Sequence, residues 1–312
     1  MVVITGHQGM SDDNSKNTLI VIEGPTAVGK TAFAVALAKM LNTSVISADS
    51  RQFYKELKIG TAKPSVEEME GVHHLLLGHL SIHDYYNVSR FEQEVLTLLP
   101  VLFAENQYVI LAGGSGLYID AVCNGIDDFP DPDPELRSYL KGLLRDEGIE
   151  KLQNLLFKHD PEYYRSVDLM NPVRLQRALE VVLSTGKPYS ELRAGQPKVR
   201  DFNIVKIGLN LPREVLFARI ARRVDKMMDD GLLEEVRSLL PFRHLTALNT
   251  VGYKELFDYL DGNITLPQAV ENIKTNTRRY AKRQLTWLRR DPEVKWVEPD
   301  HVQELQAYLA DQ

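Results

Sequence analysis

A single cysteine, Cys123, stands among the 312 residues of the sequence. One thiol cannot form an internal disulfide, and with no second cysteine nearby a zinc site is not expected, so we interpret Cys123 as a small core residue. Long apolar runs are lacking too, since none approaches the roughly eighteen residues that a membrane-spanning helix needs. Residues 1–17 have neither a basic start nor a long apolar run, so no secretory signal is expected. We therefore expect a cytoplasmic protein without a membrane partner.

An overall excess of basic residues is also absent, because the net charge is −6. With 44% apolar and 26% charged residues, the composition is that of a soluble globular protein of one to two domains. Basic side chains are nevertheless concentrated near the C-terminus, and we call this group the basic stripe: Lys274, Arg278, Arg279, Lys282, Arg283, Arg289 and Arg290. No acidic residue interrupts it, and Tyr280 and Trp287 are interleaved. The pattern fits either a solvated helix face or a nucleic-acid contact.

Short apolar runs alternate with helical patterns in the first half of the chain. Strands are predicted at residues 18–23, 44–48 and 107–112, and a helix is predicted from Lys30. A further strand pattern follows at residues 203–209. Strands that alternate with helices predict an α/β fold with a parallel sheet.

The most specific motif lies between the first predicted strand and the first predicted helix. Residues 24–31 read Gly-Pro-Thr-Ala-Val-Gly-Lys-Thr, which fits the pattern G-x-x-x-x-G-K-T. In such a phosphate loop the backbone amides surround a phosphate, the lysine adds a positive charge and the threonine hydroxyl contacts Mg²⁺. The motif predicts phosphate binding in a fold like that of the P-loop NTPases, and it leaves the molecule that carries the phosphate open.

Prolines mark a domain junction at residues 127–134, where no regular element is expected. Helical patterns continue from there to about residue 192. The sequence therefore predicts a P-loop core with a helical C-terminal part, a helical insertion and an extension at the N-terminus that is expected to be flexible. Their predicted bounds are 18–128 with 200–312 for the core, 129–199 for the insertion and 1–17 for the extension.

An acidic residue follows the second predicted strand but not the third. Residues 109–112 lead into Gly113-Gly114-Ser115, where a nucleotide hydrolase would commonly have a metal-binding acid. Asp49 follows residues 44–48, and the carboxyl ends of parallel strands face the ligand crevice. Asp49 is thus predicted to lie near the phosphate loop, where it could accept a proton, steady a metal-bound water or cap a helix.

With these motifs in order, the sequence resembles the tRNA dimethylallyltransferases, also called tRNA isopentenyltransferases. The resemblance spans residues 18–290. Besides the phosphate loop, it is carried by D-S-R-Q-F-Y-K-E-L-K-I-G-T-A-K-P at 49–64, H-H-L at 73–75, G-G-S-G-L-Y at 113–118, N-P-V-R-L-Q-R-A-L-E at 171–180, T-G-K-P at 185–188, V-G-Y-K-E-L at 251–256 and A-K-R-Q-L-T-W-L-R at 281–289.

The resemblance implies a donor site for dimethylallyl pyrophosphate with Mg²⁺. The residues implied to bind the pyrophosphate are Gly24, Pro25, Thr26, Ala27, Val28, Gly29, Lys30 and Thr31. Thr31 would contact Mg²⁺, which is held mainly by pyrophosphate and water. Asp49 matches the general base, and Arg223 resembles an arginine that holds the pyrophosphate, with Arg222 as the alternative. Asp49, Lys30, Thr31 and Arg223 are therefore the expected catalytic residues.

The resemblance also implies a surface for the tRNA anticodon loop. Ser115 stands where the family more often has threonine. The implied tRNA contacts are Asp49, Ser50, Arg51, Gln52, Ser115, Arg137, Val173, Arg174, Leu175, Gln176, Arg177, Asn249, Gly252, Tyr253, Lys254, Lys282, Arg283, Gln284, Trp287 and Arg289. Phe53, Tyr54 and Tyr118 could stack on a base, but packing in the core is the preferred interpretation for each.

The expected reaction is transfer of a dimethylallyl group to N6 of adenosine 37, next to the anticodon, in tRNAs that read codons beginning with U. Its products are N6-dimethylallyladenosine and pyrophosphate, and a monomer is expected. The alternatives are a P-loop kinase of small molecules, transfer of the same group to free AMP, and an RNA-binding protein that has lost catalysis. The kinase gives no role to the basic stripe, and intact Lys30, Thr31 and Asp49 argue against lost catalysis.

Overall fold

The structure is a computed structural model that describes residues 17–127, 129–131, 133–193, 195–305 and 309. Two compact units divide these residues. The first unit, which we call the core, comprises the described residues up to Cys123 and from Arg200 onwards, and the second comprises the described residues from Asn124 to Val199. The predicted extension at residues 1–17 lies outside the described residues apart from Asn17, whose carbonyl accepts a hydrogen bond from the Asn203 amide.

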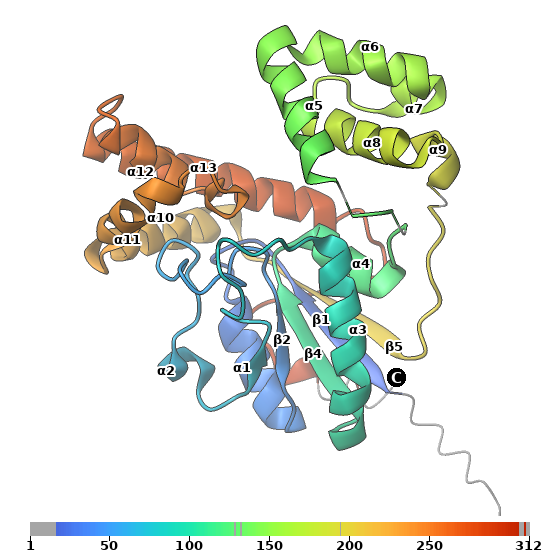
Figure 1. Cartoon of the computed structure of the whole chain (residues 1–312). Helices are drawn as coiled ribbons and strands as arrows, with labels where there is room; N and C mark the ends of the chain where they lie inside the picture. The colour runs from blue at the N-terminus through green and yellow to red at the C-terminus, as the bar shows by residue number, and fades with distance from the viewer. Residues whose placement is uncertain (1–16, 128, 132, 194, 306–308, 310–312) are drawn as a thin grey trace, which may run out of the picture. The chain divides into compact units, whose positions relative to one another are not determined.

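A parallel sheet runs through the core (Figure 1). Its described strands are β1 Thr18–Glu23, β2 Val45–Ala48, β3 His74–Leu75, β4 Tyr108–Gly113, β5 Asn203–Leu209 and β6 Lys295–Val297. They are arranged in the order β3-β2-β4-β1-β5-β6, and every neighbouring pair is parallel. The predicted α/β fold is therefore confirmed. Sequence patterns missed β3 and β6, which are too short to show a periodicity.

Both faces of the sheet are buried, which explains why its central strands are continuous apolar runs. Alternate residues of β1 point to opposite faces. Ile20 and Ile22 pack on one face with helices α1 (Lys30–Leu41) and α10 (Arg213–Asp229). Leu19 and Val21 pack on the other with α3 (Val88–Glu105) and α4 (Gly116–Asn124), where Cys123 is buried as predicted.

The carboxyl ends of β1, β2 and β4 lie at the same edge of the sheet. Glu23 at the end of β1 is in register with Gly113 of β4 and with Gly208 of β5, and Ala48 of β2 is also in register with Gly113. The segments that follow these strands are the phosphate loop, Asp49 and Gly114. The sheet thus brings together three motifs that are far apart in the sequence.

The C-terminal part of the core adds a helical layer with its own apolar cluster. Its elements are α11 (Leu232–Leu239), two 3₁₀ turns (Leu240–Phe242 and Thr246–Leu248), α12 (Tyr253–Leu260) and the long α13 (Leu266–Leu288). They pack with the segment after β2 that includes Tyr54 and Leu57, and α2 (Val66–Met69) follows that segment. Within the part of the chain that the structure describes, no helix is long and apolar enough to cross a membrane.

The second unit contains helices only, as the predicted insertion does. They are α5 Pro134–Glu147, α6 Ile149–His159, α7 Pro161–Ser166, α8 Pro172–Thr185 and α9 Tyr189–Leu192. The unit begins at Asn124, ahead of the predicted bound, and has a separate apolar cluster around Leu152 and Leu179. Asp133, Asp160 and Asn171 accept hydrogen bonds at the starts of α5, α7 and α8, each followed by proline.

Candidate active site

The phosphate loop connects β1 to α1 and has a backbone that its sequence allows. Gly29 caps the start of α1 with a φ of 114°, a conformation that glycine adopts without steric cost. Ala27 also has a positive φ, of 66°. The free amides at the start of α1 and its helix dipole favour an anion at this position.

Lys30 is directed back over this loop. Its Nζ donates hydrogen bonds to the carbonyls of Gly24, at 2.9 Å, and Pro25, at 3.0 Å. Burial lowers the pKa of Lys30 to about 8, although Asp49 nearby opposes the shift. An ammonium held by backbone carbonyls next to a phosphate loop is ready to exchange those partners for phosphate oxygens.

Two arginines one turn apart on α10 reach the same loop. Arg223 Nη1 lies 3.4 Å from Thr26 Oγ1, and Arg219 Nη1 donates to the Val28 carbonyl at 3.0 Å. Arg222 is exposed, so the structure places Arg223 at the loop. Burial lowers the pKa of Arg223, and Asp49 opposes that shift. Sequence reasoning missed Arg219, although its spacing of four residues from Arg223 puts both on one helix face.

Asp49 follows β2 and lies close enough to Lys30 and Arg223 to act on the pKa of each. Its Oδ1 accepts a hydrogen bond from the Arg51 amide at 3.0 Å, and Oδ2 has no described hydrogen-bond donor. Next to it, the Ser50 amide donates to Ser115 Oγ at 2.9 Å. The carboxylate of Asp49 therefore has a free oxygen at the edge of the phosphate loop, with Ser115 fixing the backbone beside it.

Gln284 of α13 joins the phosphate loop to the segment after β4. Its Oε1 accepts a hydrogen bond from the Thr26 amide at 2.8 Å, and its Nε2 donates to the Gly114 carbonyl at 2.8 Å. A Cβ built on Gly114 would lie 2.4 Å from Gln284 Nε2 and 3.6 Å from Lys30 Nζ. The three groups therefore meet, and the structure places Gln284 at the phosphate loop.

A cavity of about 280 Å³ opens beside these residues. Aromatic side chains of Tyr118, Tyr280 and Trp287 form much of its wall. The Trp287 indole lies so close to Gly116 that a Cβ there would be 2.4 Å from the ring, and only glycine permits that approach. Polar and charged lining residues are Glu23, Ser50, Ser115, Arg283 and Gln284. The cavity therefore has an aromatic lining and reaches the phosphate loop at Gly24.

Glu23 contributes an acid that sequence reasoning did not select. It is buried at the end of β1 and lines the cavity. Burial raises the pKa of Glu23 to about 8, and Asp120 and Asp291 add to the shift. The group is therefore mostly protonated near neutral pH and adds little negative charge beside the phosphate loop.

Comparisons with known proteins match this geometry to one family. The family model described as IPP transferase matches residues 52–291. The chain belongs to the IPP transferase family. It is 52% identical to tRNA dimethylallyltransferase 1 of Bacteroides thetaiotaomicron, covering 94% of this chain and 95% of that protein. It is 50% identical to tRNA dimethylallyltransferase of Christiangramia forsetii, covering 91% and 94%.

Solved structures agree with this membership. The full-length tRNA isopentenylpyrophosphate transferase of Bacillus halodurans is 38% identical, with a TM-score of 0.69, and the match covers 95% of this chain and 96% of that one. A eukaryotic dimethylallyltransferase described as acting on tRNA is 30% identical, with a TM-score of 0.73, and the match covers 87% and 70%. The resemblance drawn from the sequence motifs is therefore confirmed.

The D-S-R-Q block at residues 49–52 is one of the motifs that resemble this family. The side chains of Arg51 and Gln52 form hydrogen bonds within the protein. Arg51 Nη1 donates to the carbonyls of Thr246 and Ala247 at 3.0 and 3.2 Å. Gln52 Nε2 donates to the carbonyls of Thr61 and Ala62, both at 3.1 Å. These bonds hold the loop after β2 in place around Asp49.

Two expected tRNA contacts require correction, because their side chains are fully buried. Leu175 packs in the apolar cluster of the helical unit. Tyr253 packs in the C-terminal helical layer, and its hydroxyl donates to Glu235 Oε1 at 2.6 Å. The same carboxylate accepts hydrogen bonds from the amides of residues 58–60. Phe53 and Tyr54 are also core residues, in agreement with the preferred interpretation.

The other expected contacts in the helical unit lie on α5 and α8. Arg137 forms a two-point ion pair with Glu180, at 2.7 and 3.0 Å, and Arg177 lies 3.4 Å from the same carboxylate. Val173 is 71% exposed. Arg174 is exposed and Gln176 is half-buried.

Most of the expected contacts in the C-terminal part of the core are exposed. Asn249, Lys254, Lys282, Arg283 and Arg289 all reach the surface, whereas Gly252 is buried. The basic stripe is not uniformly unpaired, since Lys274 bonds Asp225 of α10 at 2.7 Å and Glu271 at 3.1 Å. Arg279 and the four cations from Lys282 onwards are exposed to the solvent.

Proposed function

We propose that the chain transfers the dimethylallyl group of dimethylallyl pyrophosphate to N6 of adenosine 37 in tRNAs that read codons beginning with U. The observation that carries the proposal is the juxtaposition of a phosphate loop, a free carboxylate oxygen on Asp49 and an aromatic-lined cavity. The names of the relatives, which describe transfer of a dimethylallyl group to tRNA, support the same reaction. A cytoplasmic monomer is part of the proposal.

The donor would lie with its pyrophosphate on the loop. Residues Gly24 to Thr31 supply the backbone amides, while Lys30 and Arg223 supply positive charge. As the bond between C1 and the bridging oxygen breaks, its electron pair goes to the pyrophosphate. Charges fixed in advance at that oxygen lower the barrier because they need no reorganisation during the reaction.

The acceptor amine needs a base and a dry, well-shaped site. The lone pair of N6 is drawn into the adenine ring, so the amine is a weak nucleophile and its orientation matters greatly. N6 forms the new bond to C1, and its proton passes to the free oxygen of Asp49. The rings of Tyr118, Tyr280 and Trp287 line the cavity and limit the access of water to the allylic carbon.

Mg²⁺ is the proposed cofactor. The described residues hold no group of three His, Cys, Asp or Glu side chains that could enclose a metal ion, which fits an ion bound chiefly by pyrophosphate oxygens and water. The hydroxyl of Thr31, at the start of α1, is the protein group expected to reach it. When bound, the ion neutralises charge on the departing pyrophosphate.

A transfer assay tests the proposal with radiolabelled dimethylallyl pyrophosphate, Mg²⁺ and unmodified tRNA that reads codons beginning with U. Label is expected in an anticodon-loop adenosine, with none on AMP. Label on AMP alone would indicate an enzyme that transfers the dimethylallyl group to free AMP. Phosphate transfer from ATP would indicate a P-loop kinase of small molecules. Either result would be consistent with phosphate binding at the loop but would contradict the proposal that tRNA is the acceptor.

Asp49→Ala gives the matching test of the base. The variant should bind donor as the unchanged protein does or slightly better, because a negative charge near the pyrophosphate is gone. Turnover at saturating tRNA should fall by about 10²- to 10⁴-fold, the range for loss of a general base. Asp84→Ala, which removes a carboxylate that accepts a hydrogen bond from the Ser81 amide, is the control. Normal turnover in Asp49→Ala would rule out Asp49 as the base.

A further inference from the structure

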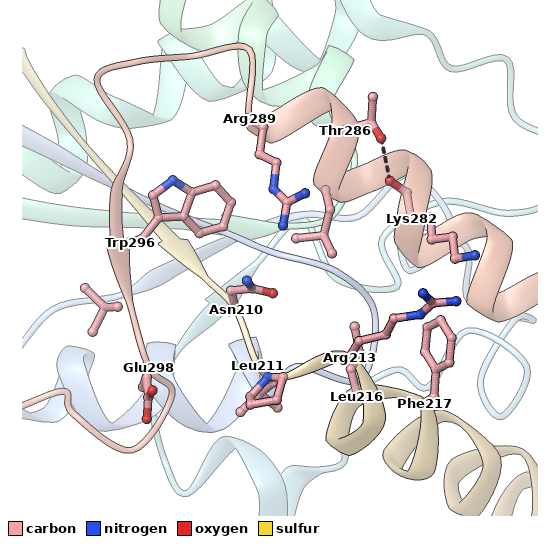
Figure 2. A pocket seen from close by; sticks show the side chains of 13 residues that line it. Asn210, Leu211, Arg213, Leu216, Phe217, Lys282, Thr286, Arg289, Trp296 and Glu298 are labelled. Carbon is pink, nitrogen blue, oxygen red and sulfur yellow. Dashed lines mark hydrogen bonds between the residues drawn. The ribbon is translucent and has the colours of Figure 1, made fainter.

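A second cavity of about 660 Å³ lies on another side of α13 (Figure 2). Residues 282, 285 and 286 of α13 and Arg289, which follows the helix, line it, whereas residues 280, 283, 284 and 287 of α13 line the cavity of the candidate active site. The remaining walls come from the end of β5, the start of α10 and β6. The two cavities share no lining residue, so this one is not an extension of the donor site.

Three cations line the second cavity. Arg213, Lys282 and Arg289 form no ion pair with any described residue, and Glu298 is the acidic residue of the lining. Arg213 and Lys282 both face the Phe217 ring, at 5.1 and 5.8 Å from its centroid. Figure 2 shows the guanidinium of Arg289 directed into the cavity below α13. Unpaired cations around one cavity favour an anionic ligand.

The lining of the second cavity is also aromatic and apolar. Trp296 of β6 is 40% exposed and is among the lining residues, and Figure 2 shows its indole at the cavity. Leu211, Leu216 and Leu285 complete an apolar lining. A simple inorganic anion would leave this surface uncovered, whereas a nucleotide joins an anionic phosphate to a flat ring that can stack on the exposed indole.

A polar group without a partner lies among these side chains. Asn210 follows β5, and its Oδ1 is buried without a hydrogen-bond partner among the described residues. Buried polar atoms are nearly always hydrogen-bonded, so an orphaned one indicates a missing water or ligand. A carboxamide offers both a donor and an acceptor, which suits the edge of a nucleobase.

We propose that this cavity binds one nucleotide, with its phosphate at Arg213, Lys282 and Arg289, its base on Trp296 and the base edge at Asn210. The volume is in the range of small-ligand sites. The nucleotide is either free or part of an RNA strand, and the second source rests on the proposed function. Neither source requires the transfer reaction to occur in this cavity.

The sequence supplies a direct probe, because it contains two tryptophans. Trp287→Phe leaves Trp296 as the single tryptophan, and its fluorescence can be followed while AMP is added. Saturable quenching is expected. Arg213→Glu should weaken AMP binding about tenfold or more, the effect of losing one charge-assisted contact. Arg222→Glu makes the same charge change at an exposed position on α10 outside the lining, and it should leave AMP binding unchanged.

An RNA arm distinguishes the two sources. Filter binding of an unmodified anticodon stem-loop is measured for Arg213→Glu, Trp296→Ala and Trp296→Phe, each checked for an unchanged thermal transition. The cavity is assigned to RNA if AMP causes no quenching while Arg213→Glu and Trp296→Ala lose RNA affinity. Trp296→Phe should then restore part of that affinity. Quenching by AMP that is lost in Arg213→Glu assigns it to free nucleotide.

One outcome would overturn the proposal: AMP causes no quenching, and both pocket variants bind RNA as Arg222→Glu does. Transfer by the unchanged protein at saturating donor is measured separately. Because Arg213 and Trp296 line no part of the candidate active site, failure of the nucleotide proposal and failure of the proposed reaction give different results.

Discussion

At the scale of single residues, the candidate active site depends on the charge of Lys30. Burial lowers the pKa of Lys30 to about 8, so the ammonium is present below that pH and is lost above it. Affinity for magnesium pyrophosphate should therefore fall about tenfold between pH 7 and pH 9.5. The measurement is competition by pyrophosphate against labelled donor.

Lys30→Met provides the comparison for this pH dependence. The variant lacks the titrating ammonium, so its pyrophosphate affinity should be weak at pH 7 and should fall less than that of the unchanged protein up to pH 9.5. Pyrophosphate itself gains negative charge as the pH rises, which would strengthen binding if Lys30 stayed protonated. A wild-type affinity that rises with pH would therefore contradict the assigned role.

Gln284 is predicted to act on the donor and not on the tRNA. Gln284→Glu keeps an acceptor for the Thr26 amide but cannot donate to Gly114, and it places a negative charge next to the phosphate loop. The KM for donor should rise about tenfold or more, while tRNA affinity should change little. Gln268→Glu, at an exposed position on the same helix, is the control. A loss confined to tRNA affinity would assign Gln284 to the RNA instead.

Sequence reasoning at this scale succeeded where the signal was local. The phosphate loop and Lys30 lie within one short motif that specifies its own backbone. The partner of Gln284 could not be predicted, because Thr26 lies 258 positions away. Leu175 shows a different failure. The resemblance assigned a whole segment to tRNA, whereas the spacing of Leu175, Ala178, Leu179 and Val182 indicates a buried helix face.

At the scale of elements, α13 lines two separate cavities with different residues, and its exposed cations are predicted to contact tRNA. Lys282→Glu combined with Arg283→Glu should weaken tRNA binding, and the salt dependence should become shallower by about two charges, since each phosphate contact contributes about 0.9 to the slope. Filter binding from 50 to 300 mM salt measures both. Lys39→Glu with Lys226→Glu reverses two exposed cations on α1 and α10. An equal loss of tRNA affinity in the Lys39→Glu, Lys226→Glu variant would show that tRNA binding depends on the net charge of the protein and not on Lys282 and Arg283.

The elements themselves were predicted well where their apolar runs are long. Strands β1 and β5 were predicted with their observed bounds, and β2 and β4 within one residue at each end. Strand β3 contains only His74 and Leu75, which show no alternation. The helix positions of Arg219 and Arg223 follow from the sequence, but their approach to the phosphate loop depends on how α10 packs on the sheet.

At the scale of the whole molecule, the helical unit is joined to the chain through adjacent segments. The Lys198 amide donates to the Asn124 carbonyl at 2.7 Å, so the entry and exit of this unit lie side by side. Within the core, Arg200 donates to the carbonyls of Ala121 and Val122 and pairs with Glu92. Contacts within the core therefore fix the chain just before and just after the helical unit, without contributions from α5 to α9.

Replacing residues 126–197 by a short glycine-serine linker should leave a core that folds. Its apolar clusters are separate from that of the helical unit. Magnesium pyrophosphate should bind as before, while tRNA affinity should fall because Arg174 and its neighbours are removed. A thermal melt and pyrophosphate binding check the outcome, with the same linker inserted after Gly125 in the full chain as control. An unfolded product would show that the two units depend on each other.

The hydrogen bond between Lys198 and Asn124, where the chain enters and leaves the helical unit, also has a consequence for evolution. Because the chain leaves and rejoins the sheet layer at one point, a helical unit of another size can be exchanged there without shifting the register of β4 or β5. Such an exchange alters one continuous segment of the coding sequence and leaves the phosphate loop unchanged. Under the proposed function, in which both the helical unit and the core contact tRNA, selection can then change the contacts of the helical unit separately from the donor site.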